Sequence, residues 1–177
     1  MVTLRDATAS DSASIAQLHA ESWRSAYRGI LSDEYLETRA HSERAELWQT
    51  RFSERAGNPF FVILAELGAQ LAGFACVFPK EHPIFGSYVD NLHVAPQLTR
   101  KGIGKRLLAD VGRRLIADQT PGGVYLWAIE QNNNARQFYS RVGAVEVGCE
   151  EFAMPDGGHV KEVRCYWPSP AELLQQP

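Results

Sequence analysis

At 177 residues, the chain has the length of one globular domain with a single hydrophobic core, and it is short for two. A composition that is 45% hydrophobic and 22% charged is that of an ordinary globular protein. A net charge of −3 argues against a general affinity for nucleic acid or for an anionic membrane, so any anion site has to be local. The start, MVTLRDATASDS, is too polar for a signal peptide, and no apolar run approaches the roughly 18 residues that span a bilayer. We expect a cytoplasmic protein without a nucleic-acid or membrane partner.

The cysteines and histidines give no sign of a metal site. Cys76, Cys149 and Cys165 are odd in number and far apart, which indicates free thiols rather than a disulfide framework or a zinc site. Four histidines show no spacing typical of metal ligands and are best taken as structural or surface residues: His19, His41, His82 and His159.

The first half of the chain predicts strands and two helices. Residues 2–6 form a short strand, and Thr8 followed by Asp11 resembles a capping box that starts a helix ending near Gly29. A charged, weakly amphipathic helix covers about residues 42–53. Residues 60–67 and 71–78 are apolar and joined by a short glycine-containing link, which predicts a β-hairpin.

The second half alternates strands and helices. A strand at 87–94 leads through a turn into an amphipathic helix from Ile103, and another strand follows at 124–129. A short helix at 133–142 is closed by Gly143 as its C′ residue. The pattern ends with a hairpin of residues 144–154 and 159–166.

This order, β-α-α-β-β-β-α-β-α-β-β, predicts an α/β protein with a mixed, mostly antiparallel sheet and helices on both faces. The strand–helix–strand segment at 87–129 predicts a parallel pair with a right-handed crossover. We expect one domain over residues 1–167 and a C-terminal tail over 168–177, which either is loose or docks on a partner.

The segment at 99–105, TRKGIGK, lies between a strand and an amphipathic helix, and its glycines let an anion approach free backbone N–H groups. A glycine-containing turn with a solvated basic face is the plainer interpretation. Two other nucleotide motifs are excluded by spacing. A P-loop requires glycine where Thr99 stands and Ser or Thr where Arg106 stands, and the dinucleotide fingerprint requires a small residue at Leu107.

Two blocks of sequence resemble the GCN5-related N-acetyltransferase (GNAT) superfamily. The first is LHVAP at 92–96 followed by TRKGIG at 99–104, which is similar to the family's fourth strand and its Q/R-x-x-G-x-G/A signature. The second is LWAIE at 126–130 followed by NNNARQFY at 132–139 and Gly143, which is similar to its fifth strand and N-x-x-A-x-x-F-Y-x-x-x-G helix. The resemblance covers about residues 2–167. Thr99 departs from the pattern, because Gln or Arg is usual at that position.

The resemblance implies that acetyl-CoA is the co-substrate and that no covalent enzyme intermediate forms. The pantetheine would pair with backbone at residues 92–94, and a backbone N–H near Val94 would stabilise the oxyanion. The residues implied in coenzyme A binding are Leu92, His93, Val94, Arg100, Lys101, Gly102, Ile103, Gly104, Lys105, Asn132, Ala135 and Tyr139. Asn132 has the alternative role of N-cap of the following helix.

Catalysis requires an acid and a route for the amine proton. The resemblance makes Tyr139 the general acid that protonates the leaving thiolate, although a phenol packed beside Phe138 is the alternative. Family members with a glutamate base carry it where Tyr88 stands here. Asp90, His93 and water-mediated deprotonation therefore remain as alternatives.

Acceptor binding is implied for Trp23, Tyr27 and Trp127, with the loop at 29–35. The leading hypothesis is an acetyltransferase acting on a primary amine of a small molecule or a protein, and a homodimer is an assembly to be tested. The alternative from another class is a non-catalytic CoA-binding or regulatory module of the same fold.

Overall fold

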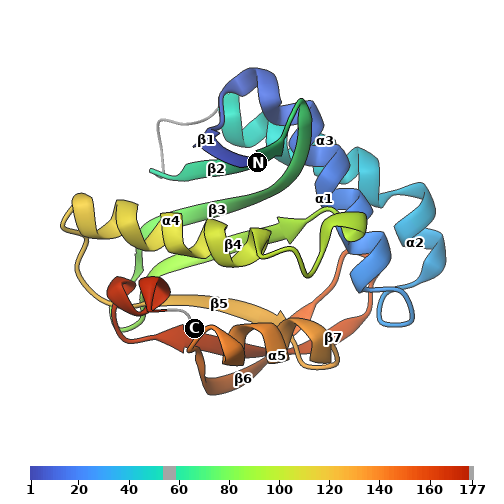
Figure 1. Cartoon of the computed structure of the whole chain (residues 1–177). Coiled ribbons are helices and arrows are strands. Elements are labelled where there is room, and N and C mark those ends of the chain that lie inside the picture. The colour runs from blue at the N-terminus through green and yellow to red at the C-terminus, as the bar shows by residue number, and fades with distance from the viewer. Residues whose placement is uncertain (54–58, 176–177) are drawn as a thin grey trace. The chain divides into compact units, whose positions relative to one another are not determined.

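The computed structural model describes residues 1–53 and 59–175 (Figure 1). It contains a seven-stranded sheet with the order β1-β2-β3-β4-β5-β7-β6. The strands are β1 (Val2–Asp6), β2 (Phe61–Leu67), β3 (Gln70–His82), β4 (Gly86–Val94), β5 (Val124–Ile129), β6 (Val145–Ala153) and β7 (His159–Trp167). The α-helices are α1 (Ser12–Ala26), α2 (Asp33–Thr38), α3 (Ala40–Ser53), α4 (Ile103–Ala117) and α5 (Asn133–Arg141). Short 3-10 helices are η1 (Ala9–Asp11), η2 (Pro96–Leu98) and η3 (Pro170–Leu174).

The predicted mixed sheet is confirmed. β4 and β5 run parallel, with Ser87 and Tyr88 opposite Val124 and Tyr125. β1 with β2, β5 with β7, and β6 with β7 are antiparallel. At the start of the parallel pair the backbones come so close that a Cβ on Gly86 would lie 2.2 Å from the carbonyl oxygen of Gly123, so glycine is required there.

The described chain divides into two compact units. The first contains Met1–Cys76 and Asn91–Leu107, and the second contains Val77–Asp90 and Leu108–Pro177. β3, β4 and α4 therefore each contribute residues to both units. The prediction of one domain over 1–167 stays a prediction.

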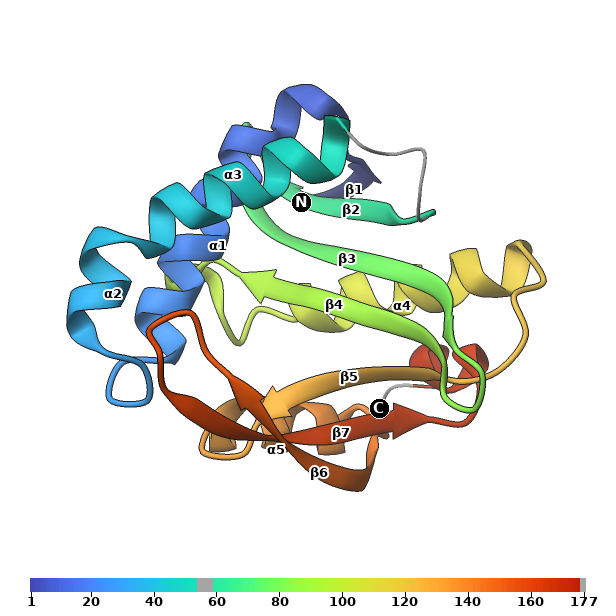
Figure 2. The same ribbon diagram turned by 180° about the vertical axis from the view of Figure 1, so that it is seen from behind.

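In the first unit α1 and α3 pack side by side (Figures 1 and 2). Their contact buries large side chains against the strands, because Ile15 of α1, Trp48 of α3 and Phe74 of β3 are each fully buried. Gly73 brings β3 against β4 and α4, since a Cβ there would lie 2.8 Å from the carbonyl oxygen of His93 and 3.2 Å from Ile103.

In the second unit Trp167 of β7 is the largest fully buried side chain. Its indole N–H donates to the carbonyl of Val142, 2.9 Å away, at the end of α5. Gly143 has φ +88° immediately after that end, which confirms it as the C′ residue.

The predicted tail docks on its own chain. Pro170 and Leu173 of η3 are buried, and they approach Gly112 of α4 so closely that a Cβ on Gly112 would lie 2.7 Å from the Pro170 carbonyl oxygen. The last two residues of the predicted tail, 176 and 177, lie outside the described residues.

The largest differences from the prediction concern three parts of the chain. The helix expected from Thr8 opens with η1, and α1 begins at Ser12. The segment at 29–35, expected to be a loop, runs into α2, whose N-cap Ser32 accepts from the Tyr35 N–H at 3.3 Å. β3 continues four residues beyond Phe78, through Pro79 and Lys80, and Lys80 adopts φ +59° with its N–H donated to Ser87 Oγ.

The capping interaction predicted for Asp11 is present. Its Oδ2 accepts from the Thr8 N–H at 2.8 Å, and its Oδ1 lies 2.8 Å from Arg5 Nη2. The hydrogen bond from Arg5, followed by those from Thr8, lowers the pKa of the Asp11 carboxyl well below its usual range.

We expect Asp11→Ala to lower the free energy of unfolding by about 1 kcal/mol, the usual value of an N-terminal cap. Because the folded pKa is depressed, this contribution is present above the ordinary carboxyl pKa of about 3.9 and is lost as the pH falls below it. Chemical denaturation at pH 7 and pH 3 measures both effects. Asp118→Ala, which removes an exposed carboxylate after α4, is the control and should change stability by less than about 0.5 kcal/mol at either pH. An equal effect of the two changes at pH 7 would contradict the capping role.

Candidate active site

The turn before α4 combines unusual backbone geometry with positive charge. Arg100 adopts φ +62° and Gly102 φ +75°, and a left-handed Arg is a strained conformation that clusters at functional sites. Space around Gly102 is open, since a Cβ there would meet no atom within 4 Å. The N–H groups of the first turn of α4 have no intrahelical acceptor, because the first helical bond runs from the Arg106 N–H to Gly102 O at 3.1 Å.

The side chains of this turn are accessible to a ligand. Arg100 and Lys101 are exposed and Lys105 is partly exposed, whereas Ile103 is buried and anchors the helix start. Thr99 donates its hydroxyl to the carbonyl of Pro96 at 3.1 Å. The residue that departs from the family pattern therefore stabilises the preceding η2 turn.

His93, itself partly exposed, joins a network with the buried His19 and Ser22 in the first unit. Its Nδ1 is 2.9 Å from the hydroxyl of Ser22 on α1, and its ring is 4.5 Å from that of His19. Trp48 donates its indole N–H to His19 Nδ1 at 3.1 Å; a neutral His19 therefore carries its proton on Nε2.

Both imidazoles of this network are neutral at physiological pH. Burial, followed by the positive charge of Arg44, lowers the pKa of His93 to about 3. Burial is also the main cause that lowers the pKa of His19, which is 1% exposed. His93 can therefore accept or donate a hydrogen bond, but it holds an extra proton poorly.

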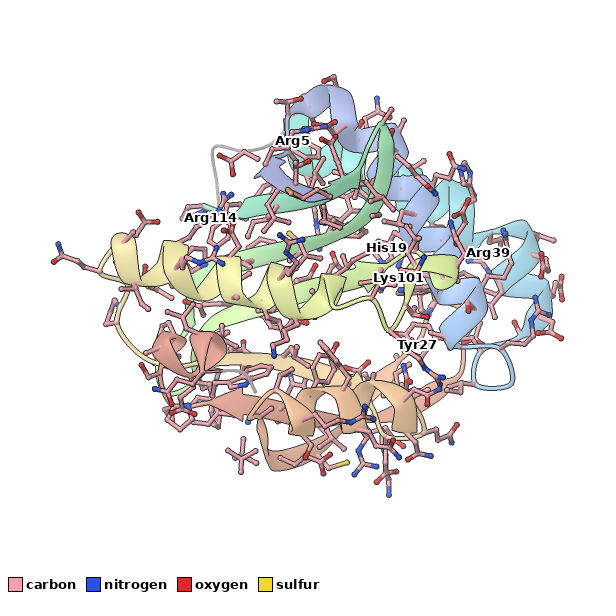
Figure 3. All side chains as sticks on the ribbon, viewed as in Figure 1. Arg5, His19, Tyr27, Arg39, Lys101 and Arg114 are labelled. Atoms are coloured by element: carbon pink, nitrogen blue, oxygen red, sulfur yellow. The ribbon has the colours of Figure 1, made fainter. Side chains whose placement is uncertain are left out.

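Two of the predicted acceptor-binding residues lie together on α1. Trp23 and Tyr27 meet edge to face with ring centroids 5.4 Å apart, and both are partly buried. Arg44 of α3 stacks over Trp23 at 4.3 Å. Figure 3 shows Tyr27 towards the C-terminal end of α1, one turn beyond Trp23 in sequence.

The second unit carries the other predicted site residues. Tyr139 of α5 is 9% exposed and meets Trp167 edge to face at 6.3 Å. Asn132 Oδ1 accepts from the Ala135 N–H at 3.2 Å, so Asn132 is the N-cap of α5. Tyr88, at the position of the family glutamate, stacks on Tyr125 with ring centroids 5.0 Å apart.

Asp90 and Trp127 lie on the sheet of this second unit. Burial, followed by the negative charge of Asp90, raises the pKa of Glu162 on β7. Trp127 stacks on the guanidinium of Arg164 at 4.2 Å. The sequence analysis did not identify Glu162 or Arg164, nor Ser22 as the partner of His93. Each of these residues is far in sequence from the predicted site residues that it lies near or contacts.

The described residues include no helix that is both long and apolar enough to cross a membrane.

Comparison with known proteins identifies relatives along nearly the whole chain. The family model described as "Acetyltransferase (GNAT) family" matches residues 16–144. The chain is 29% identical over 175 residues to "Uncharacterized N-acetyltransferase YuaI" of Bacillus subtilis, covering 98% of this chain and 96% of that protein. It is 30% identical over 141 residues to "Probable N-acetyltransferase Rv2775" of Mycobacterium tuberculosis, covering 79% and 78% of the two chains.

Solved structures share the fold. The PaiA N-acetyltransferase of Thermoplasma acidophilum in complex with coenzyme A superimposes with a TM-score of 0.69 at 20% identity, covering 92% of this chain and 98% of that chain. YncA of Salmonella typhimurium, solved with its cofactor acetyl-CoA, gives a TM-score of 0.68 at 14% identity, covering 100% and 96%. At these identities the likeness concerns the fold.

Proposed function

This chain belongs to the acetyltransferase (GNAT) family, and we propose that it transfers an acetyl group from acetyl-CoA to a primary amine of a small molecule or protein. The observation that carries the proposal is the turn at 99–104, where a left-handed Arg100, an open Gly102 and the start of α4 form a basic anion site within the region matched by the family model. The structures of PaiA and YncA, solved with coenzyme A and acetyl-CoA, support the same co-substrate. No comparison favours the alternative of a non-catalytic module.

We propose that the turn holds the pyrophosphate. Arg100, Lys101 and Lys105 supply positive charge, and the helix N-terminus supplies backbone donors. Backbone at Leu92–Val94 pairs with the pantetheine, and an N–H near Val94 donates to the developing oxyanion. Asn132 and Ala135 are proposed to contact the cofactor, as the family resemblance implies. Asn132 is also the N-cap of α5.

The reaction is a direct displacement. The neutral amine nitrogen attacks the thioester carbonyl carbon, a C–N bond forms and the C–S bond breaks. The CoA sulfur leaves with the bonding electron pair and takes a proton from Tyr139, while the amine nitrogen loses a proton. The products are the amide and CoA thiol.

His93 is poorly suited to store the amine proton. Its pKa of about 3 lies about 7 units below that of an alkylammonium, so moving the proton onto it costs about 10 kcal/mol. We propose that His93, held by Ser22, accepts a hydrogen bond from an amine that binds in its neutral form. Asp90 or water then receives the proton.

Binding of CoA tests the assignment directly. At 100 times its dissociation constant, CoA should stabilise the folded protein by about 2.7 kcal/mol, which corresponds to a rise of about 5–10 °C in Tm. ADP at the same concentration is the control, because it carries the pyrophosphate without the pantetheine and should produce a smaller shift. A folded protein whose Tm does not respond to millimolar CoA would contradict the proposed function.

A further inference from the structure

The contact between Ser22 and His93 joins α1 to β4 within the first unit. Ser22 Oγ lies 2.9 Å from His93 Nδ1, and among the described residues neither side chain makes another hydrogen bond. Either atom can be the donor, depending on which ring nitrogen carries the hydrogen. The tautomer of His93 therefore decides what this contact can do.

The neighbouring imidazole of His19 is closed to a proton from His93. Its Nδ1 accepts the indole N–H of Trp48 at 3.1 Å, so its Nε2 already carries the hydrogen. That Nε2 has no hydrogen-bond partner among the described residues, and His19 is only 1% exposed. Burial and then nearby positive charge, including that of Arg44, lower the pKa of His19, which disfavours an added proton. Within this network, a proton that passes through His93 has to continue to Ser22.

The other ring nitrogen of His93 remains for the acceptor. His93 is partly exposed, and its Nε2 makes no hydrogen bond among the described residues. In the proposed reaction Nε2 accepts a hydrogen bond from the amine, and its lone pair is free only if the ring hydrogen is on Nδ1. Nδ1–H then donates to Ser22 Oγ, so the Ser22 hydroxyl needs an acceptor of its own.

The described residues contain no acceptor for that hydroxyl other than the ring nitrogen itself. Ser22 is 9% exposed, so its side chain lies at the boundary of the buried interior. A hydroxyl left without an acceptor costs free energy, and water is the usual partner where the protein supplies none. A water molecule at Ser22 would continue the chain of hydrogen bonds from the ring to solvent.

We propose that Ser22 is a positioning residue that holds His93 with its hydrogen on Nδ1 and passes the proton of the acceptor amine to water. The inference rests on the proposed acetyl transfer and names the route by which the amine proton leaves. All of the side chains that carry it belong to the first unit, as do Leu92 and Val94.

The route moves three protons and leaves each group neutral. As the C–N bond forms, an N–H bond of the amine breaks and that proton adds to His93 Nε2. The Nδ1 proton moves to Ser22 Oγ, and the proton that Oγ held goes to the water and then to the buffer. The ring resets when Nε2 loses its proton to solvent and Nδ1 regains one through Ser22. Because imidazolium does not accumulate, the low pKa of His93, about 3, does not oppose this route.

The tautomer of His93 is the first test, and it requires no acceptor. In CoA-loaded protein labelled with ¹⁵N-histidine, the assigned chemical shifts of the two ring nitrogens show which one carries the hydrogen. We expect the hydrogen on Nδ1. A hydrogen on Nε2 would overturn the proposal, because that nitrogen could not accept from an amine.

The second test is the rate of the transfer step, with n-butylamine as the probe. Ser22→Ala should lower the single-turnover rate of the acetyl-CoA complex about 100-fold, the low end of the usual contribution of a proton-transfer group. KM for the amine and the dissociation constant of acetyl-CoA should change little. Ser22→Thr keeps the hydroxyl and should restore most of the rate. Ser25→Ala, which removes an exposed hydroxyl from the same helix, is the matched control and should react at the parent rate.

The solvent isotope effect separates a relay from a purely structural role. The parent rate should depend on the deuterium fraction along a curve, because several protons move together, and Ser22→Ala should give a nearly straight line. A straight line for the parent would overturn the proposal. So would a folded Ser22→Ala that reacts at the parent rate, or a folded Ser22→Thr that is as slow as Ser22→Ala.

Two outcomes need a separate decision. If Ser22→Thr does not fold, the tautomer and the isotope effect decide together. If n-butylamine is not acetylated, the tautomer of His93 decides alone. The CoA-dependent change in Tm judges the proposed function separately.

Discussion

Replacing Tyr139 with phenylalanine is expected to lower kcat about 10²–10⁴-fold, the usual contribution of a positioned acid or base. The reason is that the variant lacks the only proton this side chain can give to the departing CoA thiolate. Affinity for CoA should change little, because the ring and its packing against Trp167 and Phe138 are preserved. Thiol release in the steady state and the dissociation constant of CoA are the two measurements.

The pH dependence gives a second readout for Tyr139. In the parent, turnover should fall at high pH, where a phenol ionises and can no longer donate. In Tyr139→Phe this limb should move or disappear. Turnover equal to that of the parent on a proven acceptor would show that the thiolate leaves without this proton. A thermal melt of the same preparation controls for loss of folding.

Most of the fold could be predicted from local patterns. β5 was predicted at residues 124–129, its observed extent, because it is an uninterrupted apolar run bounded by glycines and by the Asn-rich start of α5. α5 was predicted at 133–142 and ends one residue earlier, since Gly143 determines that end through its left-handed backbone. Such signals act within a few residues and can be read directly.

The missed elements depend on contacts made elsewhere in the fold. α2 has only six residues, too few to show helical periodicity, and it is stabilised by burial of Tyr35 and Leu36. The extension of β3 passes through Pro79, which ordinarily ends a strand. Here Lys80 donates its N–H to Ser87 Oγ of β4 and the strand continues, which the sequence of β3 does not reveal.

The same limit applies to the candidate site. The spacing of glycines and basic residues at 99–105 predicts an anion-binding turn; the structure places these residues at the start of α4, and anion binding stays a prediction. The pairing of Ser22 with His93 joins residues 71 positions apart, and no local pattern announces it. Glu162 could have been noticed as one of three alternating polar residues on β7, yet its interaction with Asp90 requires the strand order β4-β5-β7.

The turn can be tested by a single change in α4. Gly104 is the second residue of this helix. Its N–H therefore has no acceptor within the helix and is free to bind an anion. Gly104→Val places a β-branched side chain between this backbone and an approaching pyrophosphate. Gly102 is less suitable, because its φ of +75° would strain any side chain and confuse lost binding with lost stability.

We expect Gly104→Val to weaken CoA binding about 10–100-fold, the loss of one or two charge-assisted hydrogen bonds of about 1.5–3 kcal/mol each. kcat at saturating acetyl-CoA should fall much less, since the proposal assigns the turn to the phosphates and not to the thioester. Ala117→Val makes a comparable change at the exposed C-terminal end of the same helix and should leave CoA affinity unchanged. Calorimetry with CoA on the three proteins measures the effect. If Gly104→Val and the parent bind CoA equally, the phosphates are held elsewhere. The proposed roles of the turn and of Arg100, Lys101 and Lys105 in phosphate binding would then be wrong.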